Sequence, residues 1–311
     1  MKLHENQSEF RELITLTALE KHISESAVER DYYIVRALKQ LADSEEADNC
    51  VFKGGTSLSK CYPGTIERFS EDIDLTFYKT EGLSNKQIER RLKAVEKTMT
   101  AGARTEPIIS ERNDRNKSMF FWYGGEDSRI KLEIGSSVRP DPFSRKSFKT
   151  YIQEYLELHG FESEAAGYHL VPVELNVLNI ERTFLDKIMA VKRHAICGTL
   201  PQKVRHIYDV VQLYKLPDNQ AFLQNKEELK RLLLLTKNTD SVYLEKRNIP
   251  AAYNPSGAYD FPSWKDSFSN DVQSIYEHLH EDLLFTDEKQ EFSAAVQTFE
   301  EISAAFAEIG E

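Results

Sequence analysis

The 311-residue chain has no uninterrupted apolar run of the roughly 18 residues that a membrane-spanning helix needs. Its three cysteines, Cys50, Cys61 and Cys197, are scattered and show no CxxC spacing, which argues against a disulfide framework or a thiolate metal site. The first residues, MKLHENQSEF, lack the apolar core of a signal peptide. These absences predict a cytoplasmic protein with no membrane partner.

The remaining composition is that of an ordinary globular protein, with 40% hydrophobic and 29% charged residues. Its formal net charge of -11 is concentrated at one end. The segment Pro262 to Glu311 contains two Lys or Arg residues and twelve Asp or Glu residues, which leaves 38 and 39 for the first 261 residues. The acidic balance therefore belongs to the C-terminal segment, and the rest of the chain is free to bind phosphate.

The first half of the chain mixes helical and strand patterns. A helix is predicted over 26 to 43, where apolar residues recur at three- and four-residue spacing after Ser24 or Ser26. A strand, a tight turn at a double glycine and a helix are predicted over 50 to 62. A charged amphipathic helix is predicted over 85 to 100. Further strands are predicted over 69 to 78, 118 to 123, 129 to 135 and 169 to 178, the middle two as a hairpin around Gly124-Gly125.

From Glu181 onward the apolar pattern changes to a helical period. Helices are expected near 181 to 196, 203 to 214, 219 to 236 and 263 to 310, with a loop over 250 to 262. The expected fold class is therefore α/β (α+β), with a mixed sheet followed by a helical C-terminal lobe. The predicted divisions are N-terminal helices over 1 to 46, a catalytic core over 47 to 180 and the helical lobe over 181 to 311.

Two carboxylates stand on the polar side of the predicted strand 69 to 78. Asp72 and Asp74 alternate with the apolar Ile73 and Leu75, so both carboxylates project from one face. Their Cα atoms would lie roughly 6.5 Å apart, close enough to share divalent cations. Cations held in this way neutralise phosphate charge during phosphoryl transfer. The alternative interpretation is a solvated strand face, since the pattern is short.

A glycine loop precedes this strand. Gly54 and Gly55 lack a Cβ where the backbone would approach a ligand, and Thr56 and Ser57 would begin a helix, whose N-terminus favours anions. A double glycine alone is often only a turn. Its place between a strand and a helix, 15 residues before Ser70, favours a phosphate-binding loop.

Glu133 is the third candidate carboxylate. It alternates with Leu132 and Ile134 on the second strand of the predicted hairpin, and so lies on the polar face. On a strand beside Asp72 and Asp74 it would complete the metal site or act as a general base. A surface glutamate on a half-exposed strand remains the alternative.

Lys187 lies on an apolar stripe of the predicted helix 181 to 196. The stripe also contains Phe184, Val191 and His194. A lysine in this position usually extends outward to solvent, and the functional alternative is a cation that reaches triphosphate oxygens. On the next predicted helix, Arg205 and Asp209 have the spacing of an ordinary helix ion pair. Arg205 and Asp209 become candidate site residues because their helix should pack beside the helix that contains Lys187.

Four segments together resemble the AbiEii/AbiGii (MenT-like) nucleotidyltransferase toxins, within the polymerase-beta-type nucleotidyltransferase superfamily. The resemblance spans roughly residues 28 to 214 and is most specific in its first two motifs. The motifs are Gly54-Gly55-Thr56-Ser57-Leu58-Ser59-Lys60, Arg68-Phe69-Ser70-Glu71-Asp72-Ile73-Asp74-Leu75, Thr183-Phe184-Leu185-Asp186-Lys187 and Arg205-His206-Ile207-Tyr208-Asp209.

The resemblance implies a bilobal enzyme that uses an NTP with Mg²⁺ or Mn²⁺. Such proteins are toxins of type IV toxin–antitoxin or abortive-infection (phage-defence) systems, so a cognate antitoxin is implied, and some members extend the 3′ end of tRNA. By motif position, Asp72 and Asp74 would hold metal, Lys187 would bind triphosphate and Asp209 would complete the pocket. Glu133 joins the metal set by analogy to the third carboxylate of the superfamily. The implied nucleotide-binding residues are Gly54, Gly55, Thr56, Ser57, Lys60 and Ser70.

Two rival functions remain open at this stage. One is transfer of a nucleotide or phosphoryl group to protein on the same scaffold, and the other is a catalytically silent module that senses nucleotide. If the acceptor is RNA, we expect it to avoid the acidic segment and to approach from the side of Lys192 and Lys203. The wider set of candidate phosphate contacts, any of which can instead be solvated charges, is Arg90, Arg91, Lys93, Arg145, Lys146, Lys149, Lys192 and Lys203.

Overall fold

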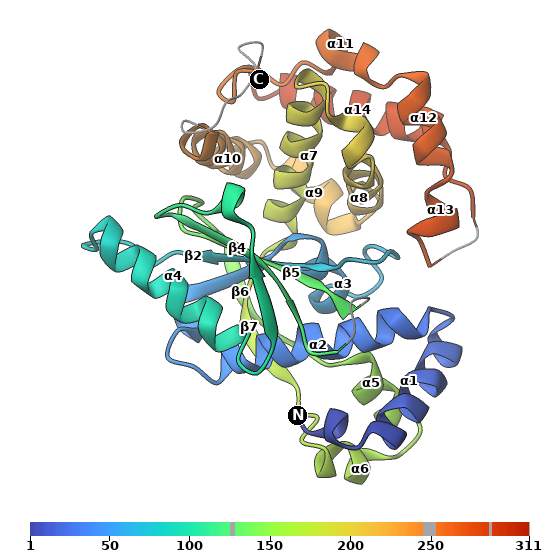
Figure 1. Cartoon of the computed structure of the whole chain (residues 1–311). Helices are drawn as coiled ribbons and strands as arrows, with labels where there is room; N and C mark the ends of the chain where they lie inside the picture. Colours follow the sequence, from blue (N-terminus) through green and yellow to red (C-terminus); the bar gives the residue numbers. More distant parts are fainter. Residues whose placement is uncertain (125–127, 245–252, 286–287, 311) are drawn as a thin grey trace. The chain divides into compact units, whose positions relative to one another are not determined.

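A computed structural model of the chain describes residues 1–124, 128–244, 253–285 and 288–310 (Figure 1). The chain forms two compact units, which we call the sheet unit and the helical unit. The sheet unit comprises Met1–Cys61, Phe69–Ser136 and Phe143–Val177. The helical unit comprises Tyr62–Arg68, Ser137–Pro142 and Leu178–Glu311. Two short early segments of the chain thus belong to the helical unit, which the change of period at Glu181 did not predict.

The sheet unit is built on a mixed sheet, seven-stranded in the described part of the chain, with the order β3-β4-β5-β2-β1-β7-β6. β1 pairs antiparallel with β2, β2 pairs parallel with β5, and β5 pairs antiparallel with β4. This arrangement confirms the mixed α/β fold class and the predicted hairpin, although Gly125 in its turn lies outside the described residues. The strands are β1 (Cys50–Lys53), β2 (Asp72–Phe77), β3 (Arg104–Pro107), β4 (Asn116–Trp122), β5 (Ile130–Gly135), β6 (Phe143–Phe148) and β7 (Val173–Leu178).

Helices pack on this sheet and on one another. Helix α2 begins where Ser24 accepts a hydrogen bond from the backbone N–H of Ala27, and α4 begins with a capping box between Ser84 and Gln87. Helix α4 contacts β4 and β5, while α1, α2 and α5 contact one another, as Figure 1 shows. The helices are α1 (Gln7–Lys21), α2 (Glu25–Ala42), α3 (Gly54–Cys61), α4 (Asn85–Met99), α5 (Tyr151–Leu158) and α6 (Glu162–Gly167), with 3-10 turns at Leu3–Glu5, Ala47–Asn49 and Ile109–Glu111.

The helical unit is centred on α7, which contacts α8, α9 and α10. The single helix expected over 219 to 236 is wrong, because the chain breaks at Asn225. The Asn225 side chain accepts from the backbone N–H of Glu228 and so starts a new helix. The helices are α7 (Ile180–Ile196), α8 (Arg205–Tyr214), α9 (Pro217–Gln224), α10 (Lys226–Leu244), α11 (Phe261–Trp264), α12 (Asn270–Glu277), α13 (Leu279–Asp282) and α14 (Phe292–Ala307), with 3-10 turns at Leu200–Lys203 and Lys265–Ser267.

The acidic C-terminal segment forms several helices that pack into the helical unit. Phe261 and Phe299 are fully buried, and Trp264 and Phe268 contact both rings. Helix α14 contacts α8 and α9, as Figure 1 shows for α8. The segment therefore contributes a buried aromatic core beneath its acidic surface. Of the expected loop, residues 250–252 lie outside the described residues, and 253–260 contain neither helix nor strand. None of the described helices has the length and apolar character needed to cross a membrane.

Candidate active site

The three predicted carboxylates lie on one face of the sheet. Asp72 and Asp74 are half-buried on β2, and they alternate with the buried residues Ile73 and Leu75. In the parallel pairing of β2 with β5, Asp74 is the direct neighbour of Glu133. Directly paired residues point to the same side of a sheet, so the polar edge of β2 continues onto β5.

The glycine loop lies directly against this carboxylate pair. Gly54 has a φ of +86°, a conformation that side chains with a Cβ rarely adopt. A Cβ at this position would stand 2.2 Å from Oδ2 of Asp74. The absence of a side chain at Gly54 therefore lets the Asp74 carboxylate pack against the loop backbone, which enters helix α3 from there.

The loop hydroxyls hold the loop in place. Thr56 Oγ1 donates hydrogen bonds to Ser70 Oγ, at 2.9 Å, and to the backbone carbonyl of Asp72. Ser57 Oγ donates to the carbonyl of Gly54 at 2.9 Å. Both side chains are buried. These bonds attach α3 to β2, and the groups that the loop offers to phosphate are the amides of the first turn of α3.

Glu133 is engaged by a lysine. Lys131 Nζ lies 2.5 Å from Oε1 of Glu133 and 2.9 Å from Oε2 of Glu111. Within the described residues, no group of three His, Cys, Asp or Glu side chains is arranged to hold a metal ion. Mg²⁺ commonly takes one or two protein carboxylates and completes its shell with substrate phosphate and water, and the pair Asp72 and Asp74 has the donor chemistry for that arrangement.

Lys60, at the end of α3, occupies a different environment. Its side chain is buried, with Nζ 2.8 Å from Oδ1 of Asp31 and 3.9 Å above the ring of Tyr151. Asp31 Oδ2 also accepts from the backbone N–H of Tyr151 at 2.7 Å. Burial raises the pKa of Asp31, and the charge of Lys60 opposes that rise. Lys60 thus joins α3 to α2 and α5.

In the helical unit, Lys187 and Asp209 form a buried ion cluster with Arg68. Asp209 is fully buried and accepts two hydrogen bonds from Arg68, from Nε at 2.6 Å and from Nη2 at 2.7 Å. Lys187 Nζ lies 2.8 Å from Oδ2 of the same carboxylate. The interpretation of Lys187 as a solvent-directed lysine is wrong, because only 8% of it is exposed. Asp209 forms its close ion pairs with Arg68 and Lys187, rather than the ordinary helix pair with Arg205.

His206 completes this cluster as a neutral group. Its Nδ1 lies 3.3 Å from Lys187 Nζ. Burial, reinforced by the charge of Lys187, lowers the pKa of His206 to about 3. Burial alone would raise the pKa of Asp209, but Arg68 and Lys187 hold it well below its usual value. One carboxylate therefore faces two cations, which keep it ionised. Arg68 and His206 stand in the sequence motifs, but only packing revealed their roles.

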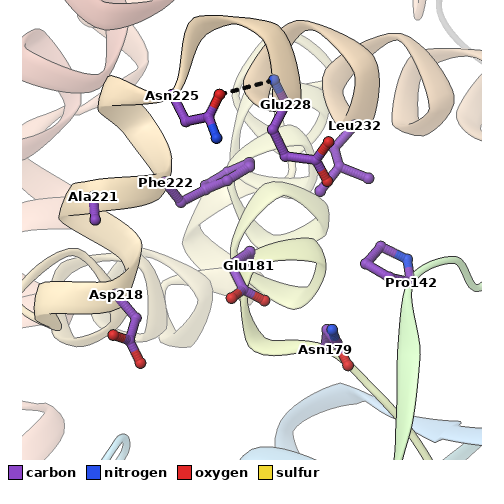
Figure 2. Close-up of a pocket in the computed structure, with 9 residues that line it drawn as sticks. All are labelled: Pro142, Asn179, Glu181, Asp218, Ala221, Phe222, Asn225, Glu228 and Leu232. Atoms are coloured by element: carbon purple, nitrogen blue, oxygen red, sulfur yellow. Dashed lines mark hydrogen bonds between the residues drawn. The ribbon is translucent and has the colours of Figure 1, made fainter.

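The helical unit also contains a cavity of about 380 Å³, shown in Figure 2. Three of its lining side chains are the carboxylates Glu181, Asp218 and Glu228, and Phe222 supplies an aromatic wall. Its lining residues include no Lys or Arg. Because carboxylates repel phosphate, this cavity is unsuited to a triphosphate.

Comparison with known families identifies the chain. The family model described as nucleotidyl transferase AbiEii toxin, of type IV toxin–antitoxin systems, matches residues 36–306. The chain belongs to this family. The match includes the glycine loop, the Asp72 strand and the cluster around Asp209. None of the curated proteins matches the sequence.

Two solved structures are similar to this AbiEii-family chain. MenT4, a nucleotidyltransferase toxin from Mycobacterium tuberculosis H37Rv, is 18% identical, with 96% of this chain and 98% of MenT4 covered at a TM-score of 0.52. JHP933 from Helicobacter pylori is 20% identical, with 83% and 95% covered at a TM-score of 0.40. At 18% identity, the likeness to MenT4 is one of fold.

One predicted RNA contact of this AbiEii chain is corrected by the structure. Lys192 is 3% exposed and donates hydrogen bonds to the carbonyls of Gly257 and Ala258, at 3.1 and 2.8 Å. It therefore ties α7 to the segment before α11 and cannot contact an external phosphate. Several of the other candidate charges are engaged in ion pairs on the surface, namely Arg91 with Glu46, Lys93 with Glu89, Arg145 with Asp48 and Lys149 with Glu157.

Proposed function

We propose that this AbiEii-family chain transfers a nucleoside monophosphate from an NTP to the 3′-hydroxyl of an RNA, such as the acceptor end of tRNA. The observation that carries this proposal is the close packing of Gly54 against Asp74. The N-terminus of α3, a position suited to phosphate, begins within contact distance of Asp74, and β2 presents Asp72 from the same face as Asp74. The groups that we assign to phosphate and to metal are thus next to each other.

The reaction forms a bond between the acceptor oxygen and the α-phosphorus. The bond from that phosphorus to the bridging oxygen breaks, and pyrophosphate leaves. Mg²⁺ or Mn²⁺ held by Asp72 and Asp74 would neutralise charge on the phosphates. The first-turn amides of α3 bind phosphate oxygens, and Glu133, beside Asp74, accepts the proton of the attacking hydroxyl.

From its position in the third family motif, Lys187 is the cation that we assign to the triphosphate, and its ammonium group is held by Asp209. Asp209 is fully buried, so we assign it as a positioning residue that acts through Lys187. Arg68 fixes the carboxylate in turn, four residues before Asp72 in the sequence. Family membership further supports a role as the toxin of a type IV pair with a cognate antitoxin.

The test is incubation with each labelled NTP, Mg²⁺ and total bacterial RNA and protein. We expect label in RNA, and we expect Asp72→Asn and Asp74→Asn to reduce transfer by roughly a thousandfold or more, because each removes charge while keeping volume. Lys187→Met should raise the KM for NTP. Asp271→Asn, on an exposed turn of α12, is the matched control. Label found only in protein, or undiminished transfer by both aspartate variants, would contradict the proposal.

A further inference from the structure

The face of the sheet that bears the carboxylates continues beyond β5 onto β4. Asp72 pairs with Lys131 on β5, and Lys131 pairs in turn with Phe120 on β4. Directly paired residues share a face, so Phe120 lies on the same side as Asp72, two strands away. At the usual strand spacing the two Cα atoms are roughly 10 Å apart.

Phe120 is partly exposed and forms a cation–π pair. The guanidinium carbon of Arg129, an exposed residue, lies 4.3 Å from the centre of the Phe120 ring. Two residues further along β4, on the same face, the guanidinium of Arg104 lies 4.5 Å from the ring of Trp122. Trp122 is buried, so Phe120 with Arg129 is the arginine–aromatic pair that is partly exposed beside the carboxylate strands.

The partly exposed Phe120 side chain is not explained by the core that α4 covers. The alternate residues Met119 and Phe121 are buried, as are the inward residues of α4, which contacts β4 and β5. Phe120 points to the opposite face, where its neighbours are Lys131 and Glu106. An aromatic ring capped by arginine on a polar sheet face is an arrangement that stacks unpaired nucleobases, while the guanidinium attracts the phosphate chain.

We propose that Phe120 and Arg129 form a stacking platform for the terminal base of the RNA acceptor. This inference rests on the proposed function, in which RNA is the acceptor. The order of the strands decides between the acceptor and the NTP base. Gly54 follows β1, on one side of β2, whereas Glu133 and Phe120 lie on the other side, on β5 and β4. The triphosphate and the platform thus flank Asp72 and Asp74, and the acceptor hydroxyl enters past Glu133.

The experiment measures transfer of the preferred labelled NTP to total bacterial tRNA, with tRNA and NTP varied separately. Phe120→Leu removes the ring and Arg129→Gln removes the guanidinium, so we expect each to raise the KM for tRNA about tenfold, equivalent to about 1.4 kcal/mol. The KM for NTP and the kcat at saturating tRNA should stay within about twofold. Phe120→Tyr should keep the KM for tRNA close to the wild-type value, because the tyrosine ring can also stack on a base.

The matched controls are Phe161→Leu and Arg11→Gln, an exposed aromatic and an exposed arginine elsewhere in the sheet unit. Thermal unfolding confirms that each variant is folded, and Arg129→Gln tests the proposal even if Phe120→Leu is unstable. An unchanged KM for tRNA would overturn the inference, as would a raised KM for NTP alone. If the wild-type protein labels RNA and both variants have the wild-type KM for tRNA, the proposed stacking platform is wrong but the proposed function stands. If wild type labels no RNA, the proposed function is wrong as well.

Discussion

At the scale of single residues, the cluster around Asp209 shows how burial and charge set a protonation state. A buried carboxylate is costly unless it is paired, and here two cations and several hydrogen bonds hold it ionised. Burial, reinforced by the charge of Lys187, lowers the pKa of His206, so this side chain stays neutral. The position of Lys187 therefore depends on three neighbours rather than on its own helix.

His206 predicts how stability depends on pH. Its pKa is about 3 in the folded chain and about 6.5 when unfolded, so the unfolded state binds a proton first as pH falls. This contribution to stability is fully present above about pH 6.5 and is lost progressively between there and pH 3. The free energy of unfolding should fall by about 2 kcal/mol more, between pH 7 and pH 5, in wild type than in His206→Gln.

Urea unfolding at the two pH values measures this difference. His278→Gln, at an exposed position after α12, controls for loss of an imidazole in general. An equal fall in wild type and in His206→Gln would show that His206 does not titrate as its surroundings imply.

At the scale of elements, the turn from β1 into α3 joins the phosphate loop to the metal strand. Gly54→Ala would place a Cβ against Asp74, whereas Gly82→Ala would add one in open space at a similar φ of +73°. Each should lose about 1–2 kcal/mol of stability from the left-handed backbone. Only Gly54→Ala should also reduce nucleotidyl transfer, by about a hundredfold, because a small displacement of a reacting group has that effect.

Thermal unfolding and the transfer assay separate the two effects. Equal activity of the two alanine variants would show that the contact between Gly54 and Asp74 has no part in the reaction.

At the scale of the whole molecule, the net charge of -11 is carried mainly by the segment that forms α11 to α14. Its apolar side is buried within the helical unit, and its acidic side chains form surface contacts. Glu300 pairs with Lys265 at 2.7 Å, and Glu301 accepts from the hydroxyl of Tyr214. Such exposed pairs contribute at most about 1 kcal/mol each, so this surface tolerates changes of charge.

Replacing Glu300 and Glu301 together by Lys should leave RNA labelling and growth inhibition unchanged, since RNA phosphate is repelled by this segment. Labelling of tRNA and growth after induced expression in a bacterial host measure the outcome, with Asp72→Asn as the inactive reference. Loss of labelling in the folded double variant would place the RNA surface on these helices. Lys192→Glu is no test of RNA binding, because it would put a carboxylate beside the two carbonyl oxygens that Lys192 binds.

The sequence by itself determined the features that depend on short-range spacing. Alternation along β2 and β5 placed Asp72, Asp74 and Glu133 on polar faces, because successive strand residues point to opposite sides. Gly54 and Gly55 located a turn between a strand and a helix for a similar local reason. The mixed fold followed from the periodicity of the predicted strands and helices, the family resemblance followed from the four motifs, and both are confirmed.

Only the tertiary structure decided which charges meet. Lys60 and Lys192 lie in segments that suggested phosphate contacts, yet distant elements enclose both, with Asp31 facing one and Gly257 the other. Arg68 meets Asp209 across 141 residues of sequence. The spacing of residues within one helix or strand determines on which face a side chain lies. The environment of a buried charge is determined by the segment that packs over that face. That packing depends on the whole chain.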